Sequence, residues 1–529
     1  MEEVIRMSIS SKNPIMPGFY PDPSICAVGE DYYLVNSSFA YFPGLPLMHS
    51  KDLVHFEQIG NVLDRESQLP LENAGVSQGL FAPTIRYHEG TFYVICTNVT
   101  HGGNFVVTAT NPEGPWSEPH YLQGADGIDP SLYFDADGKC YYIGTHPNPD
   151  GVKYNGDWFI YIQELDVQNW KMVGEKHNVW NGALKGVHWP EGPHLYKIGE
   201  YYYILHAEGG TGPEHAISVA RSKEVFGPYE NNFCNPIFTH RHMGQQYPIK
   251  YVGHADLIQT PKGEWYLTML AVRPKECFTT MGRETFLAKV TWENDWPVVN
   301  AGVGLLTDEV SVDLPEWIPE EDPDSYTCRT KHKTCVPGSS RSYDFAFMKE
   351  LGDEFMTLRK PLQDRMKLGY GEGLKLAFGE DKLTTQGVPS YVCIRQQHHV
   401  FTVSTALKTA DIAGNGVAGL VLFQNNLFHL KVEVDGSKAA LILCEKGEDK
   451  VLGEIAISGE QVKLSISVKD LAAKAYVEDA DGRKDFAVAA DVRNLSTEVA
   501  GGFVGCTAGI YAVGDASKAV TFTSLSYQA

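Results

Sequence analysis

The sequence predicts an all-β fold, a five-bladed β-propeller followed by a jelly-roll-like β-sandwich. Three observations predict it. Long helical periodicity is almost absent from the 529 residues, and short β-like runs separated by Gly, Asp, Asn and Pro take its place. A hairpin with an aromatic pair in its second strand recurs five times before about residue 310. After a stretch without apolar periodicity, a second set of alternating apolar and polar runs follows.

The five hairpins form an internal repeat. Each has a short strand, a turn, and a second strand that carries the aromatic pair, which is the pattern of an antiparallel hairpin. The pairs are Tyr32/Tyr33, Phe92/Tyr93, Tyr141/Tyr142, Tyr201/Tyr202 and Trp265/Tyr266. Repeats of about 50–60 residues are typical of propeller blades around a central channel. Tyrosine-rich hairpins could also recur by chance in a β-protein, but the matching turns favour the propeller.

A change in the residue pattern marks the predicted domain boundary. Residues 316–340 carry Pro, acidic and then basic residues without apolar periodicity, which indicates a linker. The propeller is therefore predicted over residues 1–315 and the β-sandwich over residues 341–529. In the second domain, runs such as 417–423 and 428–434 alternate apolar and polar residues and are joined by short turns.

Composition excludes several classes of partner. Acidic residues outnumber basic ones by 66 to 44, and the net charge of −22 repels phosphate backbones and anionic lipids. We therefore expect neither nucleic acid nor a membrane as a partner. No apolar run approaches the ~18 residues of a transmembrane helix, and the N-terminus lacks the pattern of a secretion signal. The ten cysteines are scattered without a CxxC, so we expect a cytoplasmic protein without a Cys-rich zinc site.

One position of the repeat gathers ionisable side chains. When the hairpins are aligned on their aromatic pairs, their first strands open with Asp22, Ala82, Asp129, Glu191 and His254. Equivalent positions of a propeller lie around one axis, so this register brings three carboxylates and one imidazole to one channel mouth. Carboxylates buried together resist ionising together, which is typical of a functional site. The plainer alternative is that Asp-Pro and Glu-Gly-Pro only open turns.

Glycoside hydrolysis is a chemistry that uses such a set. One carboxylic acid protonates the leaving oxygen, while a second carboxylate activates water or attacks directly. Blades 1 and 4 are not neighbours in a ring of five, so Asp22 would face Glu191 across the axis, as base and acid. Asp129, on the blade beside Glu191, would raise the pKa of that glutamic acid by like-charge repulsion and act as a modulator.

The motifs at these positions resemble family 43 of the glycoside hydrolases, in its β-xylosidase and α-L-arabinofuranosidase branch with a C-terminal β-sandwich. The resemblance is carried by PDPS, GLFAP, GIDPSL, EGPHLY, GHADL and GRETF. It implies exo-acting, inverting release of a terminal xylose or arabinofuranose from short oligosaccharides. It also implies that Asp22 is the base, Asp129 the pKa modulator and Glu191 the acid, and that Arg283 hydrogen-bonds the sugar.

The same resemblance implies further site residues. Phe39 and Phe81 would flank the sugar, and phenylalanine at position 81, where xylosidases often have tryptophan, leaves the choice between xylose and arabinose open. His254 falls on a position that ligates calcium in the channel of some members. One imidazole is weak support for calcium, and the alternative is a structural histidine. No organic cofactor is expected. The segment 501–511 is similar to the region of the sandwich that closes the pocket in xylosidases, and no role is assigned to it.

Two other functions stay open at this point. An endo-acting arabinanase on the same propeller would need an open groove, which the long second domain disfavours. A sugar-binding protein without catalysis would keep binding its sugar after Asp22→Asn and would turn over nothing, and the three retained carboxylates disfavour it. The linkage that is cleaved and the formation of a homo-oligomer also stay open.

Overall fold

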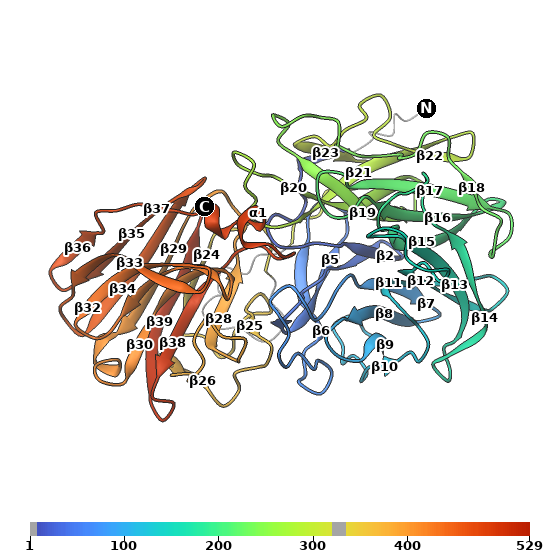
Figure 1. Cartoon of the computed structure of the whole chain (residues 1–529). Coiled ribbons are helices and arrows are strands. Elements are labelled where there is room, and N and C mark those ends of the chain that lie inside the picture. Colours follow the sequence, from blue (N-terminus) through green and yellow to red (C-terminus); the bar gives the residue numbers. More distant parts are fainter. Residues whose placement is uncertain (1–7, 320–334) are drawn as a thin grey trace, which may run out of the picture.

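The structure is a computed structural model that describes residues 8–319 and 335–529 and consists almost wholly of β-strands (Figure 1). Most of the predicted linker, residues 316–340, therefore lies outside the described residues. The first part of the chain forms a ring of sheets, and the last part forms a separate layered body beside it (Figure 1). The predicted all-β fold, propeller first and sandwich second, is confirmed.

Within the described residues, five four-stranded antiparallel sheets follow one another along the chain as blades. The aromatic pairs of the sequence repeat all lie in the second strand of a blade. The blades are β2 (Ser24–Val28), β3 (Asp31–Val35), β5 (Gly44–Ser50) and β6 (Glu57–Leu63); β7 (Thr84–His88), β8 (Thr91–Asn98), β9 (Gly103–Ala109) and β10 (His120–Tyr121); β11 (Ile128–Phe134), β12 (Cys140–Pro147), β13 (Trp158–Asp166) and β14 (Lys171–Trp180); β15 (Glu191–Ile198), β16 (Tyr201–Glu208), β17 (Ala216–Ser222) and β18 (Glu230–Asn231); and β19 (Lys250–Gln259), β20 (Trp265–Val272), β21 (Glu284–Glu293) and β22 (Trp296–Val299).

Apolar side chains from neighbouring blades pack between them. Leu47 and Val62 of the first blade share one buried cluster with Ile85, Val94 and Val107 of the second. Each side chain of this size contributes about 1.5–3 kcal/mol when it is fully buried. The alternation of apolar and polar residues along each strand therefore holds the ring together, because one set of side chains enters each interface between blades.

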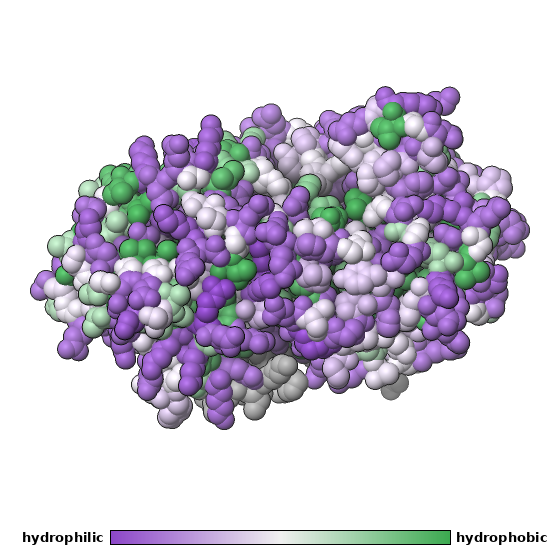
Figure 2. Space-filling view, turned by 60° about the horizontal axis from the view of Figure 1, so that its bottom comes forward, coloured by the Kyte–Doolittle hydropathy of each residue, from purple (hydrophilic) through white to green (hydrophobic). Residues whose placement is uncertain are grey.

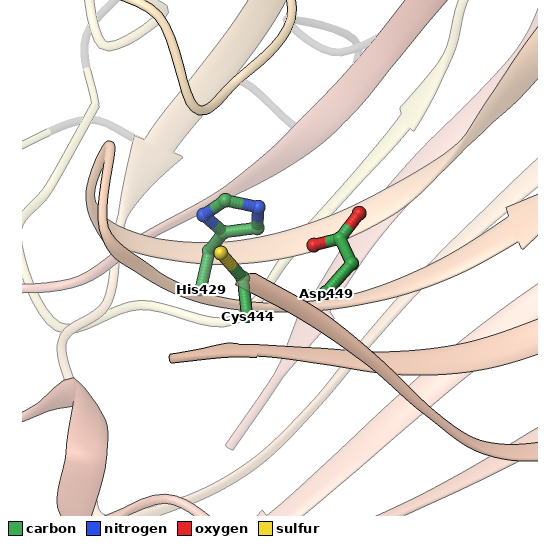
Figure 3. A group of neighbouring side chains, drawn as sticks. All are labelled: His429, Cys444 and Asp449. Carbon is green, nitrogen blue, oxygen red and sulfur yellow. The ribbon is translucent and has the colours of Figure 1, made fainter. Parts of the chain in front are cut away.

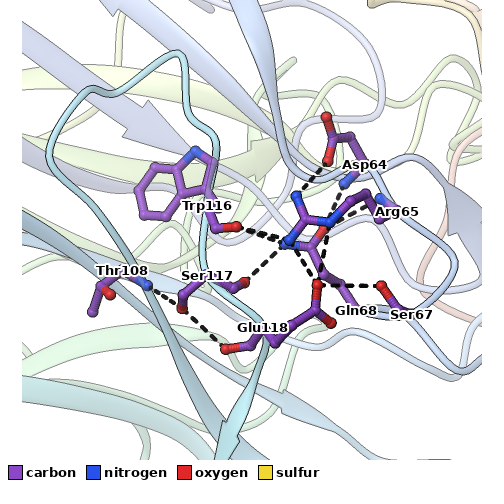
Figure 4. A network of polar contacts seen from close by, with 8 residues as sticks. All are labelled: Asp64, Arg65, Ser67, Gln68, Thr108, Trp116, Ser117 and Glu118. Carbon is purple, nitrogen blue, oxygen red and sulfur yellow. Dashed lines mark hydrogen bonds and ion pairs between the residues drawn. The ribbon is translucent and has the colours of Figure 1, made fainter.

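Polar contacts link the first two blades at the rim (Figure 4). Arg65, in the loop after β6, donates from Nη2 to the carbonyl of Trp116 at 2.8 Å and to Oε1 of Glu118 at 2.8 Å. Gln68 donates to the carbonyl of Ser117 at 2.9 Å. Exposed ion pairs of this kind contribute at most about 1 kcal/mol, so the network orders the long connection between the blades more than it stabilises them.

The start of the chain is tied to the last blade. β1 (Ile9–Lys12) pairs with β23 (Glu309–Val312) in an antiparallel two-stranded sheet. The side chain of Asn13 then exchanges two hydrogen bonds with the backbone of Leu287, at 2.9 and 3.1 Å. These contacts hold the segment that leads to Asp22 against the fifth blade.

The residues from 335 onward form a β-sandwich of two packed sheets (Figure 1). Its core includes Leu420, Leu430 and Val432 from one sheet and Val403 and Leu464 from the other. One sheet contains β26 (Met366–Gly369), β27 (Gly373–Ala377), β39 (Ala519–Gln528), β29 (Val400–Lys408), β34 (Gln461–Lys469), β35 (Ala472–Asp479) and β36 (Gly482–Asp485), with β24 (Arg341–Asp344) on β39 and β37 (Ala490–Asp491) on β35. The other contains β28 (Ser390–Arg395), β38 (Thr507–Gly514), β30 (Gly416–Asn425), β31 (Phe428–Val434), β32 (Lys438–Glu445) and β33 (Glu448–Ala456). Short helical turns are η1 (Thr409–Asp411), η2 (Arg493–Leu495) and α1 (Thr497–Ala500).

The sandwich is joined to the propeller by backbone pairing and by a buried arginine. β25 (Thr357–Leu358) pairs with β4 (Tyr41–Phe42) of the propeller. Arg359 is 1% exposed and donates to the carbonyls of Ala74 at 2.6 Å and Gly387 at 2.7 Å, one in each domain. A charge buried this deeply is stable only where its donors are satisfied, so Arg359 fixes how the two domains meet.

The segment after α1 lies directly on the propeller. α1 itself lies between the two domains (Figure 1). A Cβ atom on Gly282 would come within 2.6 Å of the backbone nitrogen of Gly505, and Gly282 has a φ of +72°. Glycine is therefore required where these two backbones meet, and this approach brings residues 501–505 beside Arg283.

The surface is mostly hydrophilic, with apolar residues scattered singly over the face in Figure 2. Among the residues that the structure describes, no helix has the length and apolar character needed to cross a membrane.

Candidate active site

The residues predicted from the hairpin register meet in one cavity. It has a volume of about 280 Å³ and is lined by Asp22, Ala82, Asp129, Glu191 and His254, each from a different blade or the segment that leads into it. Phe39, Phe81 and Arg283 line it as well. The structure thus brings together every residue that the sequence predicted for the site, while their chemical roles stay predictions.

The backbone bends at equivalent points to aim these side chains inward. Asp22, Asp129 and His254 all have left-handed backbones, with φ of +53°, +53° and +47°. In the fourth blade the left-handed residue is Gly192, which directly follows Glu191. The pairing register of β11, β15 and β19 also shifts at this point. Positive φ in residues other than glycine is strained, and strain repeated around one cavity is typical of a functional site.

Asp22 is held as a carboxylate. It is buried and accepts hydrogen bonds from Arg283 Nη1 at 2.7 Å and from Ser37 Oγ at 2.5 Å, while Nδ1 of His254 lies 3.9 Å away. Burial alone raises the pKa of Asp22, but Arg283, His254 and Ser37 together outweigh it and lower the pKa below its ordinary value. An ionised, hydrogen-bonded carboxylate can accept a proton from water.

Glu191 has the opposite electrostatics. Burial raises the pKa of its carboxyl group well above the ordinary value, and the negative charges of Asp129 and Asp22 raise it further, against a smaller effect of Arg283. The protonated form of Glu191 is therefore favoured over that of an ordinary glutamate. Two carboxyl groups whose environments separate their pKa values in this way are suited to act as an acid and a base in one reaction.

Asp129 is placed to influence Glu191. Burial raises the pKa of Asp129, and its Oδ2 accepts a hydrogen bond from the backbone N–H of Gly192 at 3.2 Å. This hydrogen bond ties the Asp129 carboxylate to the residue beside Glu191. A Cβ atom on Gly192 would lie 2.8 Å from Cε1 of His254, so only glycine leaves room for the imidazole here.

Three phenylalanines wall the cavity. The ring centroids of Phe39 and Phe81 are 5.6 Å apart, and Phe503 of the sandwich stacks on Phe39 at 6.1 Å. The N–H of Phe503 donates to Ser77 Oγ at 2.9 Å, which anchors it to the propeller. The segment 501–511, to which the sequence assigned no role, therefore contributes one wall of the cavity.

Among the lining residues that sequence reasoning missed are Trp189, Thr211 and His215. Thr211 Oγ1 accepts a hydrogen bond from Arg283 at 3.3 Å, and Nδ1 of His215 lies 2.9 Å from the carbonyl of Tyr251. Burial lowers the pKa of His215 to about 3, so it is neutral. All three residues lie outside the hairpins whose register located the carboxylates. A signal existed only for Trp189, which stands two residues before Glu191.

The sequence resemblance implied calcium at His254, with waters completing its shell. Calcium takes six to eight oxygen ligands, whereas His254 offers one ring nitrogen. In the described part of the chain, the one cluster of three metal-ligating side chains is His429, Cys444 and Asp449 in the sandwich (Figure 3). There Lys431 already pairs with Asp449 at 2.9 Å, and its ammonium group opposes a bound cation. Calcium at His254 stays a prediction, and no step below depends on a metal.

Comparisons with known proteins agree on one family. The model of "Glycosyl hydrolases family 43" matches residues 11–297, and that of "Beta xylosidase C-terminal Concanavalin A-like domain" matches residues 342–528. A xylosidase/arabinosidase of Butyrivibrio fibrisolvens is 50% identical over 98% of this chain and 99% of its own length. A non-reducing end α-L-arabinofuranosidase of Bacteroides ovatus is 38% identical over 95% of this chain and 91% of its own. The crystal structure of a xylan β-1,4-xylosidase from Bacillus halodurans superposes with a TM-score of 0.86 at 33% identity, covering 98% of this chain and 100% of that one.

Proposed function

Because the chain belongs to family 43 of the glycosyl hydrolases, we propose that it removes one terminal pentose, xylose or arabinofuranose, from short oligosaccharides with inversion at the anomeric carbon. The single observation that carries the proposal is the pair Asp22 and Glu191. The pKa of the first is lowered and that of the second is raised, and both line one cavity. These opposite pKa shifts match the base and the acid of glycoside hydrolysis.

The reaction needs one water and two proton transfers. Asp22 takes a proton from the water while the water oxygen forms a bond to the anomeric carbon. On the opposite side the glycosidic C–O bond breaks, and its electron pair goes to the leaving oxygen, which receives the proton of Glu191. The products are a free pentose of inverted configuration and an oligosaccharide shorter by one sugar. Proton exchange with solvent then restores Asp22 to its ionised form and Glu191 to its protonated form.

Arg283 and Asp129 support these steps. The guanidinium group lowers the pKa of Asp22 and also contacts Thr211, and it lines the cavity, where it can hydrogen-bond a sugar. Asp129 raises the pKa of Glu191 and so keeps the acid protonated. Asp129 does not itself need to contact the scissile bond.

The cavity favours exo action. A volume of about 280 Å³ lies at the small end of ligand pockets, which suits a single sugar ring. Phe503 of the sandwich covers one side of it, whereas an endo-acting arabinanase would need a groove open at both ends. The relatives named above act, by their names, on xylosides, arabinosides or both, which supports a pentose as the sugar released.

The proposal is tested with nitrophenyl β-D-xyloside and nitrophenyl α-L-arabinofuranoside, on the wild type and on Asp22→Ala. We expect the wild type to cleave at least one of them and the variant to lose every activity that the wild type shows. Asp22→Ala that hydrolyses at the wild-type rate would remove Asp22 from the mechanism. A wild type that binds pentosides but turns over neither would support the sugar-binding alternative.

A further inference from the structure

His215 lines the cavity beside Arg283 and Thr211, and the proposed mechanism gives it no role. It directly precedes β17 and is 2% exposed. Of its two ring nitrogens, Nδ1 lies 2.9 Å from the carbonyl oxygen of Tyr251. A carbonyl oxygen can only accept, so Nδ1 carries the proton and donates it. Burial lowers the pKa of the ring to about 3, so the ring is neutral and Nε2 is an acceptor.

Neighbouring backbone fixes the ring of His215 in this orientation. The N–H of His215 donates to the carbonyl of Gly212 at 3.1 Å, and its carbonyl accepts from Oγ1 of Thr239 at 2.7 Å. A Cβ atom on Gly253 would lie 2.2 Å from Cε1, 2.2 Å from Nε2 and 2.4 Å from Cδ2 of the ring. These near-equal distances place Gly253 over the face of the imidazole, where only glycine leaves room for it. The face of the ring therefore packs on the fifth blade, while Gly253 does not lie in line with the Nε2 lone pair.

His240 shows how the same chain satisfies such a histidine elsewhere. It is also buried, and its Nδ1 lies 2.9 Å from a backbone carbonyl, that of Ile249. Its Nε2 accepts a hydrogen bond from the N–H of Leu306 at 2.9 Å. Among the residues that the structure describes, no donor reaches Nε2 of His215, and the ring lines the cavity instead. A buried acceptor without a partner is costly, so we expect its donor to come from a molecule in the cavity.

We propose, on the basis of the proposed function, that Nε2 of His215 accepts a hydrogen bond from one hydroxyl group of the pentose and so selects a sugar with a donor at that position. The cavity has the size of one sugar ring, so the bound pentose lies within reach of its lining. Arg283 can only donate hydrogen bonds, whereas Nε2 can only accept one. The two side chains therefore recognise different atoms of the sugar, and His215 discriminates against a pentose that lacks the hydroxyl.

The test uses a nitrophenyl pentoside that the wild type cleaves, and analogues in which one hydroxyl at a time is replaced by fluorine, which cannot donate. The loss of kcat/KM for each analogue is measured in the wild type and in His215→Ala. The ratio of the two losses cancels the electronic effect of fluorine on the reaction. We expect a ratio of about ten at one ring position and of about one at the others. His240→Ala is the matched control, with ratios of about one at every position.

A second measurement follows the ring directly and does not need His215→Ala to fold. In ¹⁵N NMR spectra of the wild type, Nε2 of His215 should have the chemical shift of an unprotonated nitrogen. It should move toward the protonated range when the pentose product binds, while Nδ1 stays protonated. The resonance is assigned by its absence from the spectrum of His215→Gln. That variant keeps an acceptor, the amide oxygen, and should retain part of the discrimination at the same ring position.

Other results would overturn the inference. Ratios of about one at every position in an active wild type would overturn it and leave the proposed function standing, as would an Nε2 resonance that the pentose leaves unchanged. Ratios raised equally at every position would show that His215 shapes the cavity without recognising one hydroxyl. A wild type that cleaves no pentoside would overturn the proposed function, and this inference with it.

Discussion

Arg283 donates a hydrogen bond from Nη1 to Oδ1 of Asp22 at 2.7 Å, although 261 residues separate the two in sequence. Asp22 lies just before β2 of the first blade, and Arg283 lies just before β21 of the fifth blade. The contact therefore links the first and last blades, where the propeller ring closes. It also outweighs, together with His254 and Ser37, the effect of burial on the pKa of Asp22. Folding and the pKa of Asp22 are therefore linked, because the pKa of this buried carboxyl group is lowered only while the closed ring holds Arg283 beside it.

Asp22→Asn removes the base and keeps the shape of the side chain. We expect kcat to fall by about 10²–10⁴-fold, the range for loss of a general base. Binding of a pentose product, measured by calorimetry, should stay within a few-fold of the wild type.

Ser37→Ala is the control, because it removes one hydrogen bond to Asp22 and leaves the carboxylate in place. It should raise the pKa of Asp22 and move the acidic limb of the kcat/KM profile to higher pH, with a small loss at the optimum. A wild-type kcat in Asp22→Asn would contradict the assignment of the base.

Glu191→Gln removes the proton that the leaving oxygen receives. The loss should depend on the leaving group, because a good leaving group departs without an acid. We expect a loss of at least about 10²-fold on a disaccharide and a much smaller one on a dinitrophenyl pentoside, both measured as kcat. Equal losses on the two substrates would argue against Glu191 as the acid.

Asp129→Asn tests the modulator through the pH profile. The negative charge of Asp129 raises the pKa of Glu191, so its removal lowers that pKa. Activity needs protonated Glu191 and is lost as pH rises through its pKa. The basic limb of kcat/KM should therefore move to lower pH in the variant, while the asparagine oxygen can still accept the hydrogen bond of Gly192. A basic limb that stays in place would show that Asp129 does not set the protonation of the acid.

Asp256 is a buried carboxylate in β19 that the mechanism does not use. It pairs with Arg86 at 2.8 Å and accepts hydrogen bonds from Ser24 at 2.6 Å and from Tyr196 at 2.5 Å. Burial raises its pKa, but Arg86 and the other partners outweigh this and lower the pKa well below the ordinary value. Asp256→Asn leaves the charge of Arg86 buried without its partner and should cost about 3–5 kcal/mol of unfolding free energy at pH 7.

The pH dependence of that loss has a definite sign. A lowered carboxyl pKa contributes stability above the pKa of the unfolded chain, about 3.9, and this contribution is lost as pH falls toward the folded value. The difference between wild type and Asp256→Asn in urea unfolding should therefore shrink below about pH 4. Lys197→Met, which changes an exposed charge on the neighbouring fourth blade, is the control for a general charge effect. A difference that is constant with pH would contradict the account of Asp256.

The aromatic pairs allowed much of the site to be predicted from the sequence. The aromatic pairs occupy the same position in every blade. Aligning the hairpins on these pairs was therefore sufficient to predict that one site contains Asp22, Asp129, Glu191 and His254. Trp189 and Thr211 could not be found in this way, because they lie in connections between hairpins, where length and sequence differ from blade to blade. Phe503 comes from the other domain, and its place in the wall depends on how the two domains dock. The periodicity of residues along the chain does not predict how the two domains dock.

The configuration of the first product tests the central claim most directly. A pentoside that the wild type cleaves is hydrolysed in an NMR tube, and the anomeric proton of the released sugar is followed before mutarotation. If Asp22 activates a water across the cavity from Glu191, the first pentose to appear has the configuration opposite to that of the substrate. First appearance of the same configuration would mean that a carboxylate attacks the sugar itself, and the roles assigned to Asp22 and Glu191 would be wrong.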